Sequence, residues 1–157
     1  LIARIKAVPQ IDDSFLYRHY PIEVQRKFSD YLMEVMGMDR THCGIAETEH
    51  PYTTNFNNKD VRITTHYYED NLLSSMYSVI HEGGHAIFEQ NVNQEYNGTV
   101  AGSCCYMGIH ESQSRFYENM LGRNKNFWIP IYDKLGEILP QFKDITLEEF
   151  YESTNCN

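Results

Sequence analysis

An H-E-x-x-H motif lies near the middle of the chain, with His81, Glu82 and His85 at its fixed positions. Two histidines four residues apart on a helix rise from one face with Cβ atoms about 6 Å apart, so both imidazoles can bind the same zinc ion. Glu82 lies about 100° around such a helix from His81, where its carboxylate can reach a metal-bound water. The motif therefore indicates a zinc site of the kind that zinc peptidases use.

Glycines fill both variable positions of this motif, at Gly83 and Gly84. Each glycine in a helix interior costs about 1 kcal/mol relative to alanine. A helix with a purely structural role has little reason to carry two of them. Close approach of a second backbone, or of a substrate, would explain the pair.

A catalytic zinc ion needs a third protein ligand and one position left open. Glu111 is our candidate, because a chain reversal near Asn97 and Gly98, followed by a returning helix, would bring it to the histidine pair. His110 is the rival ligand, since it is the adjacent residue. Considered alone, Glu111 is more often a solvated helix carboxylate, so the residues by themselves leave this choice open.

Two helices must position these groups. The first is expected to begin after an N-cap at Asp70 or Asn71 and to end near Asn91. Its apolar residues recur at helical spacing along one side, namely Leu72, Leu73, Met76, Ile80, Ile87 and Phe88. The second helix is expected over 107–121, closed by Gly122. We expect the H-E-x-x-H helix to pack against this second ligand-bearing helix in a zincin-like arrangement.

Strand signals occur between the N-terminal third and these helices. Residues 51–56 are rich in strand formers, 57–59 read as a turn, and 60–67 alternate in polarity. Period-two alternation with one apolar face is typical of a half-buried antiparallel strand. These segments therefore predict a β-hairpin.

Helical signals dominate the rest of the chain. Pro21 can open a helix that ends near Gly37, with an apolar stripe of Val24, Phe28, Tyr31, Leu32, Val35 and Met36. Shorter helices are expected near 131–135 and from Thr146, which forms a capping box with Glu149. The predicted fold class is mainly α with a small antiparallel β-sheet.

Composition fits one soluble globular domain. The chain has 157 residues, of which 41% are hydrophobic and 22% charged. A net charge of −9 disfavours nucleic acid and anionic membrane surfaces as partners. No apolar run is long enough for a membrane span. Four cysteines, with no C-x-x-C pair, are expected to be free thiols in a reducing cytosol, namely Cys43, Cys104, Cys105 and Cys156.

Three ordered motifs give the sequence a specific resemblance. D-x-R-x-T occurs in 60–65, H-E-x-x-H in 81–85 and H-E-S-Q in 110–113, with a further similar stretch at 50–54. In these segments the chain resembles the carboxypeptidase Taq family of metallocarboxypeptidases. Similar patterning extends from about residue 15 to residue 151.

The resemblance implies that His81, His85 and Glu111 are zinc ligands and that Glu82 is the general base. It also implies a mainly helical fold with a small sheet beside a deep groove. It further implies a dimeric cytosolic enzyme that removes C-terminal residues from peptides, with zinc or cobalt as the metal. Motif positions that carry over as substrate-binding or ligand-supporting groups, without a settled role, are His110, Asp60, Arg62, Thr64 and Gln113.

Two further motifs of this family, I-R-x-x-A-D and G-x-x-Q-D-x-H-W, do not occur in the chain. The family is also longer on the N-terminal side. We therefore expect residues 1–157 to be a single domain that forms the central fragment of a longer catalytic domain. Groups that bind the substrate carboxylate and stabilise the oxyanion are expected outside it.

Two other classes of protein are alternatives. A di-iron carboxylate protein would need a second Glu-x-x-His motif on a helix, and 47–50 supplies the residue types. His50 precedes Pro51, however, which disfavours helix there. The other alternative is a non-catalytic module, in which the metal is structural or missing. A structural zinc is usually closed by four protein ligands, so participation of His110 or His66 would favour this class.

Overall fold

The computed structural model describes residues 2, 4, 7–8, 11–103 and 106–155. Its α-helices are α2 (Ile22–Val35), α3 (Leu72–Gln90), α4 (Met107–Arg115), α5 (Lys125–Trp128), α6 (Tyr132–Ile138) and α7 (Leu147–Thr154). A small sheet contains β1 (Cys43–Glu47), β2 (Thr53–Asn57) and β3 (Asp60–Thr65). The predicted mainly helical fold with a small sheet is confirmed.

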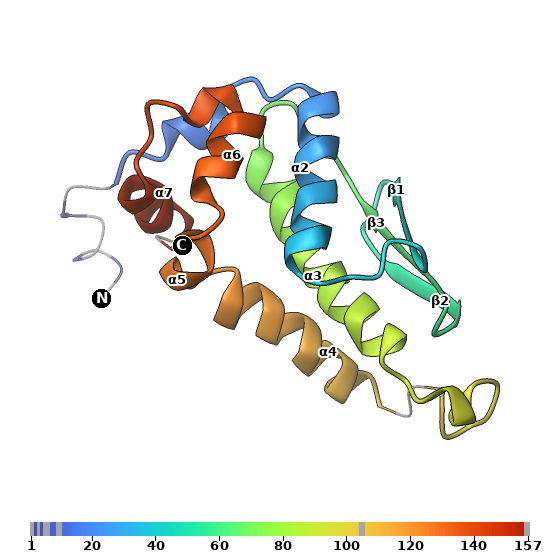
Figure 1. The fold of residues 1–157 in the computed structure, drawn as a ribbon. Coiled ribbons are helices and arrows are strands. Elements are labelled where there is room, and N and C mark those ends of the chain that lie inside the picture. Colours follow the sequence, from blue (N-terminus) through green and yellow to red (C-terminus); the bar gives the residue numbers. More distant parts are fainter. Residues whose placement is uncertain (1, 3, 5–6, 9–10, 104–105, 156–157) are drawn as a thin grey trace.

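Helix α3 is the central element, and α2, β3 and α4 all contact it (Figure 1). It begins at the predicted cap, because the Asn71 side chain accepts a hydrogen bond from the Ser74 amide. It ends at Gln90, with Asn91 as its C-cap, in agreement with the predicted end near Asn91. Most of its residues are buried, including those of the H-E-x-x-H motif other than His81. The motif therefore lies on a helix that is fixed on several sides.

Helix α2 also follows its sequence signals. It begins directly after Pro21, and Phe28 and Leu32 of the predicted stripe are buried against α3. Gly37 follows with φ 76°, a left-handed conformation that favours glycine at a helix end. The predicted helix and its C-terminal stop are both confirmed.

The sheet differs from the prediction in one respect. β2 and β3 form the expected antiparallel hairpin, with Thr53 opposite Ile63. β1 then pairs in parallel with the other edge of β3, with Cys43 opposite Val61. The sheet is therefore mixed, and the expectation of an antiparallel sheet was wrong. β1 has little local strand signal because it contains Gly44 and an alanine, so its pairing with β3 decides its conformation.

The expected helix over 107–121 is interrupted. α4 ends at Arg115 and continues as a π-helical segment, Phe116–Leu121. The π-helical segment ends before Gly122, whose amide donates a hydrogen bond to the Tyr117 carbonyl at 2.7 Å. Gly122 packs against α3, because a Cβ there would lie 3.3 Å from the Ile80 Cδ1 atom. Such segments widen one helical turn and are frequent at functional sites.

The C-terminal helices form an aromatic core at the end of the molecule away from β2 (Figure 1). The Trp128 ring packs edge-on against Phe150, with ring centroids 4.9 Å apart, and both residues are fully buried. Helix α6 covers the region predicted around 131–135. The capping box between Thr146 and Glu149 is present at the start of α7.

One of the four cysteines lies among the described residues. Cys43 is buried and forms no disulfide. Cys104, Cys105 and Cys156 lie outside the described residues. Among the described residues, no helix is long and apolar enough to cross a membrane.

Candidate metal centre

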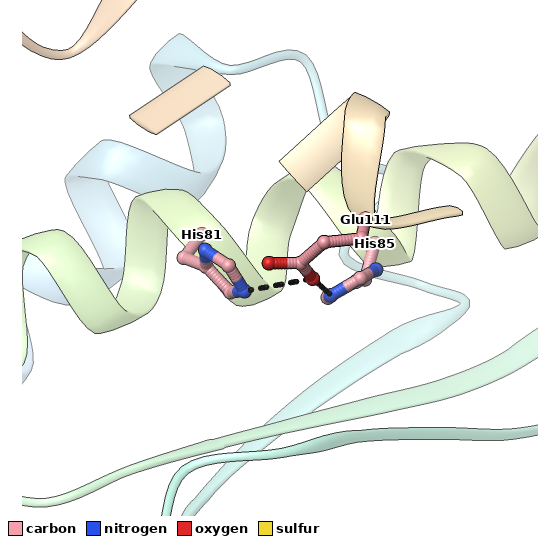
Figure 2. Close-up of side chains that lie close together, drawn as sticks. All are labelled: His81, His85 and Glu111. Carbon is pink, nitrogen blue, oxygen red and sulfur yellow. Dashed lines mark ion pairs between the residues drawn. The ribbon is translucent and has the colours of Figure 1, made fainter. Parts of the chain in front are cut away.

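Helices α3 and α4 bring His81, His85 and Glu111 to one point. The Glu111 Oε2 atom lies 3.2 Å from the His85 Nε2 atom and 3.6 Å from the His81 Nε2 atom. One ligand atom from each residue lies within 4.8 Å of the others. Figure 2 shows the carboxylate reaching from α4 between the two imidazole rings on α3. Among the described residues, this is the group of three that could hold a metal ion.

Gly84 allows the two helices to approach this closely. A Cβ atom built on Gly84 would lie 2.7 Å from the Ser114 Cα atom and 3.1 Å from the Gln113 carbonyl oxygen. These are backbone atoms, which cannot move aside as a side chain can. The expected close approach of a second backbone is confirmed at Gly84. Gly83 differs, since its nearest neighbour is the flexible end of the Met36 side chain.

Both histidines present Nε2 to Glu111 and turn Nδ1 toward another residue. The His81 Nδ1 atom lies 2.8 Å from a carboxylate oxygen of Glu118. The His85 Nδ1 atom contacts the Nδ1 atom of His110. The His110 Nε2 atom lies 2.7 Å from the Glu89 Oε1 atom. His110 is therefore placed beside a candidate ligand, outside the three-residue group itself.

The protonation of His85 and Glu111 suits a divalent cation. Burial, followed by repulsion from His110 and His81, lowers the pKa of His85 to about 4, so its imidazole is neutral at pH 7. Burial acts to raise the pKa of Glu111, but hydrogen bonds from Arg115 and Ser114 outweigh it, and the pKa is lowered. A neutral imidazole and a carboxylate are donors that Zn²⁺ accepts.

Glu82 lies beside this group, on the wall of a cavity. Its carboxylate is buried and accepts a hydrogen bond of 2.6 Å from the Thr53 hydroxyl. Burial raises the pKa of Glu82, with the Thr53 hydrogen bond acting in the opposite direction. The cavity has a volume of about 390 Å³ and is lined by Pro51, Tyr52, Thr53, Asn55, Glu82, His85, Glu89, Met107 and His110. A carboxylate with a raised pKa at such a wall can exchange a proton with a molecule in the cavity.

The other motif residues separate into two groups. Thr64 is buried and its hydroxyl accepts from the Tyr52 amide at 2.9 Å, which holds the strand that borders the cavity. Asp60 and Arg62 form an exposed ion pair of 2.9 Å and line a different hollow. The Gln113 side chain also lies away from the cavity, beside the end of α3. The fold thus does not bring Asp60, Arg62 or Gln113 to the candidate ligands.

Sequence reasoning assigned no role to three residues that contact the site. Glu89 is four residues after His85, so helical periodicity places it on the same face of α3. Glu118 is seven residues after Glu111 and depends on the path of the π-helical segment. Thr53 lies within a motif stretch, but its contact with Glu82 requires the tertiary fold. Of these three residues, only Glu89 had a local signal that could have found it.

Neither alternative class is favoured by this arrangement. Glu47 belongs to β1 and His50 follows in an irregular stretch, so the second Glu-x-x-His motif is not on a helix. The His66 Nδ1 atom lies 3.0 Å from the Thr48 carbonyl oxygen, and the residue is not part of the ligand group. His110 is also outside that group.

Known proteins share this fold and sequence. Residues 1–156 match the family model of the carboxypeptidase Taq (M32) metallopeptidases. Carboxypeptidase 1 of Bacillus subtilis is 46% identical over 145 residues, which cover 92% of this chain and 29% of that protein. Thermostable carboxypeptidase 1 of Thermus thermophilus is 39% identical over 145 residues, covering 92% of this chain and 28% of that protein. The chain thus spans under a third of these relatives.

Solved structures give the same result. The crystal structure of BsuCP superposes with a TM-score of 0.93 at 42% identity, covering 99% of this chain and 32% of that one. The crystal structure of an M32 carboxypeptidase from Deinococcus radiodurans superposes with a TM-score of 0.91 at 34% identity, covering 98% of this chain and 31% of that one. With its motif helix, its histidine–glutamate group and these matches, the chain belongs to the carboxypeptidase Taq (M32) metallopeptidase family.

Proposed function

We propose that this chain carries the metal site and the general base of a zinc-dependent metallocarboxypeptidase. The observation that supports this most directly is the convergence of His81, His85 and Glu111 from two helices, with Glu82 beside them on a cavity wall. We infer that residues 1–157 form one domain within a longer catalytic domain. The activity itself belongs to the full-length protein.

The three proposed ligands fit a catalytic rather than a closed structural ion. Two imidazoles and one carboxylate make three donors, which leaves a fourth position for water or substrate. We propose one Zn²⁺ per chain, with Co²⁺ as the other candidate metal. When bound, the ion would polarise the scissile carbonyl and make the attacking water more acidic.

Glu82 has the position and the chemistry for proton transfer. In the proposed reaction its carboxylate takes a proton from the attacking water as the water oxygen bonds to the carbonyl carbon. The C–N bond then breaks, and Glu82 returns the proton to the departing amine nitrogen. The Thr53 hydroxyl, which donates to this carboxylate, would hold it in place between the two transfers.

Recognition of the substrate's C-terminal carboxylate needs a further group. No lysine or arginine is among the described residues that line the cavity of about 390 Å³. Arg115 lines a second hollow, which Glu82 shares with His81, but its guanidinium is already paired with Glu111 and Glu118. A carboxylate is bound most strongly by a guanidinium or ammonium group. We therefore propose that the cation for the substrate carboxylate comes from another part of the full-length protein.

The family resemblance supports three further parts of the proposal. The substrates would be peptides with a free C-terminus, the full-length protein would be a homodimer, and it would act in the cytosol. A net charge of −9 is consistent with a protein that does not act on nucleic acid.

Removal of the metal tests the proposed function. We expect the full-length protein to release C-terminal residues from N-blocked peptides, to lose this activity on dialysis against a chelator, and to regain it with Zn²⁺. Elemental analysis should find about one zinc per chain. Full turnover by a protein without bound metal would overturn the proposal.

A further inference from the structure

Each of the two candidate histidine ligands contacts a second residue through the ring nitrogen that faces away from Glu111. Both Nε2 atoms face Glu111, so the position of a bound ion would depend on how the Nδ1 contacts orient the rings. His81 meets Glu118 through this atom, and His85 meets His110. Neither Glu118 nor Glu89, which holds His110, belongs to the H-E-x-x-H motif or to the ligand group.

Glu118 reaches His81 because the chain after α4 runs antiparallel to α3. Ser114 lies against Gly84, and Gly122 lies against Ile80, so the residues between them pass alongside the motif. Glu118 falls in the π-helical segment between these two contacts. Its side chain is 15% exposed and lies 2.8 Å from the His81 Nδ1 atom. An acceptor at Nδ1 keeps the ring proton there and leaves the Nε2 lone pair free.

A longer chain of contacts fixes His85. The Glu89 Oε1 atom accepts the Nε2 proton of His110, which leaves the His110 Nδ1 lone pair to face the Nδ1–H group of His85. Asn55 donates to the other oxygen of Glu89 at 2.6 Å. His110 and Glu89 have side chains only 9% exposed, so water competes little for these bonds. The effect is again a free lone pair on the ligand nitrogen.

We propose that Glu118 and Glu89 are positioning residues of the metal site, Glu118 acting directly on His81 and Glu89 acting on His85 through His110. This inference rests on the proposed function, because it assigns the metal to His81, His85 and Glu111. Carboxylates behind histidine ligands orient the ring and make it more basic, and losing them weakens metal binding by about 10- to 100-fold.

Glu118 also contacts Arg115, and a role through Arg115 must be distinguished from the proposed role through His81. Arg115 also donates to the Glu118 carboxylate, at 3.1 Å, and to Glu111, at 2.8 Å. Glu118 could therefore act only by holding Arg115 against Glu111. In that case its substitution would have no effect once Arg115 has been replaced. A double-mutant cycle with Arg115→Met distinguishes the two roles.

The first experiment measures zinc affinity in the full-length protein by competition with a chelator. Glu118→Leu removes the acceptor, whereas Glu118→Gln retains an uncharged oxygen, so we expect affinity to fall in the order wild type, Gln, Leu. The Leu variant should bind zinc about 10- to 100-fold more weakly. Glu137→Gln is the matched control, because Glu137 forms an exposed ion pair with Lys134 on α6, and it should leave affinity unchanged.

The second experiment tests Glu89. Both His110 and Asn55 donate hydrogen bonds to the Glu89 carboxylate. In Glu89→Gln the amide NH₂ group would face one of these two donors, so one of the two hydrogen bonds would be lost. We expect a similar loss of zinc affinity and a changed d–d absorption spectrum of the Co²⁺-substituted protein. Asn55→Ala removes only the hydrogen bond from Asn55 to Glu89 and should lower zinc affinity by a smaller factor. This variant tests the role of Glu89 if the Glu89 variant does not fold.

The outcomes separate the two proposals. A wild-type protein that binds no zinc and hydrolyses no peptide would overturn the proposed function. A wild-type protein that does both, with variants at Glu118 and Glu89 that keep its zinc affinity and Co²⁺ spectrum, would overturn the positioning roles alone. Loss of the Glu118 effect in the Arg115→Met background would assign Glu118 to Arg115 instead of His81.

Discussion

Gly84 of α3 lies against the backbone of Ser114 on α4, so close that a Cβ atom on Gly84 would come within 2.7 Å of the Ser114 Cα atom. This contact sets the separation of the two helices that carry the proposed ligands. It lies one residue from His85 and three residues from Glu111. The relative positions of His81, His85 and Glu111 therefore depend on the absence of a side chain at position 84.

The first prediction concerns this contact. Gly84→Ala should push α4 away from α3 and destabilise the full-length protein by about 1–3 kcal/mol, although alanine favours a helix. Zinc affinity should fall as well, because Glu111 moves with α4. Chemical denaturation and chelator competition measure the two effects.

A matched control is available in the adjacent residue. Gly83→Ala meets mainly the flexible end of Met36, so it should cost much less. Gly136→Ala on α6 meets nothing within 4 Å and should be neutral or stabilising. Equal losses at positions 83 and 84 would contradict the proposed role of the helix contact.

The second prediction separates proton transfer from metal binding. Glu82→Gln keeps the shape of the side chain but removes its ability to accept a proton. We expect zinc content to stay near one ion per chain while kcat for peptide hydrolysis falls by about 10²- to 10⁴-fold or more. Elemental analysis and a peptidase assay check both parts. Normal turnover would remove Glu82 from the role of general base.

The third prediction concerns the proposed metal ligands. His81→Ala should lose most of its bound zinc, because two remaining donors hold the ion poorly. His66→Ala is the control, since the His66 ring contacts the Thr48 carbonyl and lies outside the ligand group, and it should retain zinc. Zinc retained at full stoichiometry by the His81 variant would contradict the assignment.

The fourth prediction is a pH dependence of the metal-free protein. The pKa of His85 is about 4 in the folded state and about 6.5 when exposed, because burial disfavours the charged ring. Between these values the unfolded chain binds a proton that the folded protein does not. The His85 contribution to the free energy of unfolding should therefore fall as pH decreases from 6.5 to 4, by up to about 1.4 kcal/mol per pH unit.

A variant isolates this contribution. His85→Gln has no group that titrates in this range, so the stability of the wild type relative to the variant should decline as pH falls from 7 to 4.5. Urea denaturation at the two pH values measures the difference. A difference that is independent of pH would show that His85 does not titrate with the lowered pKa.

Local sequence signals predicted the helices that carry the site. The Asn71 cap and apolar spacing placed α3, and helical periodicity put His81 and His85 on one face because four residues make slightly more than one turn. Pro21, Gly37 and the capping box at Thr146 marked other helix ends through the local needs of the backbone. These features depend on residues near one another in the chain.

Contacts distant in sequence decided the rest. β1 has weak strand formers and exists because β3 offers an open edge, which made the sheet mixed. The residues by themselves left the choice between His110 and Glu111 open, and the resemblance to the family favoured Glu111. Packing of Ser114 on Gly84 directs the Glu111 carboxylate between the histidines and turns His110 toward Glu89. The sequence by itself thus determined the histidine pair, and its motifs indicated Glu111. Only the tertiary structure decided that Glu118 and Thr53 support the site, since their contacts depend on how two helices and a strand approach.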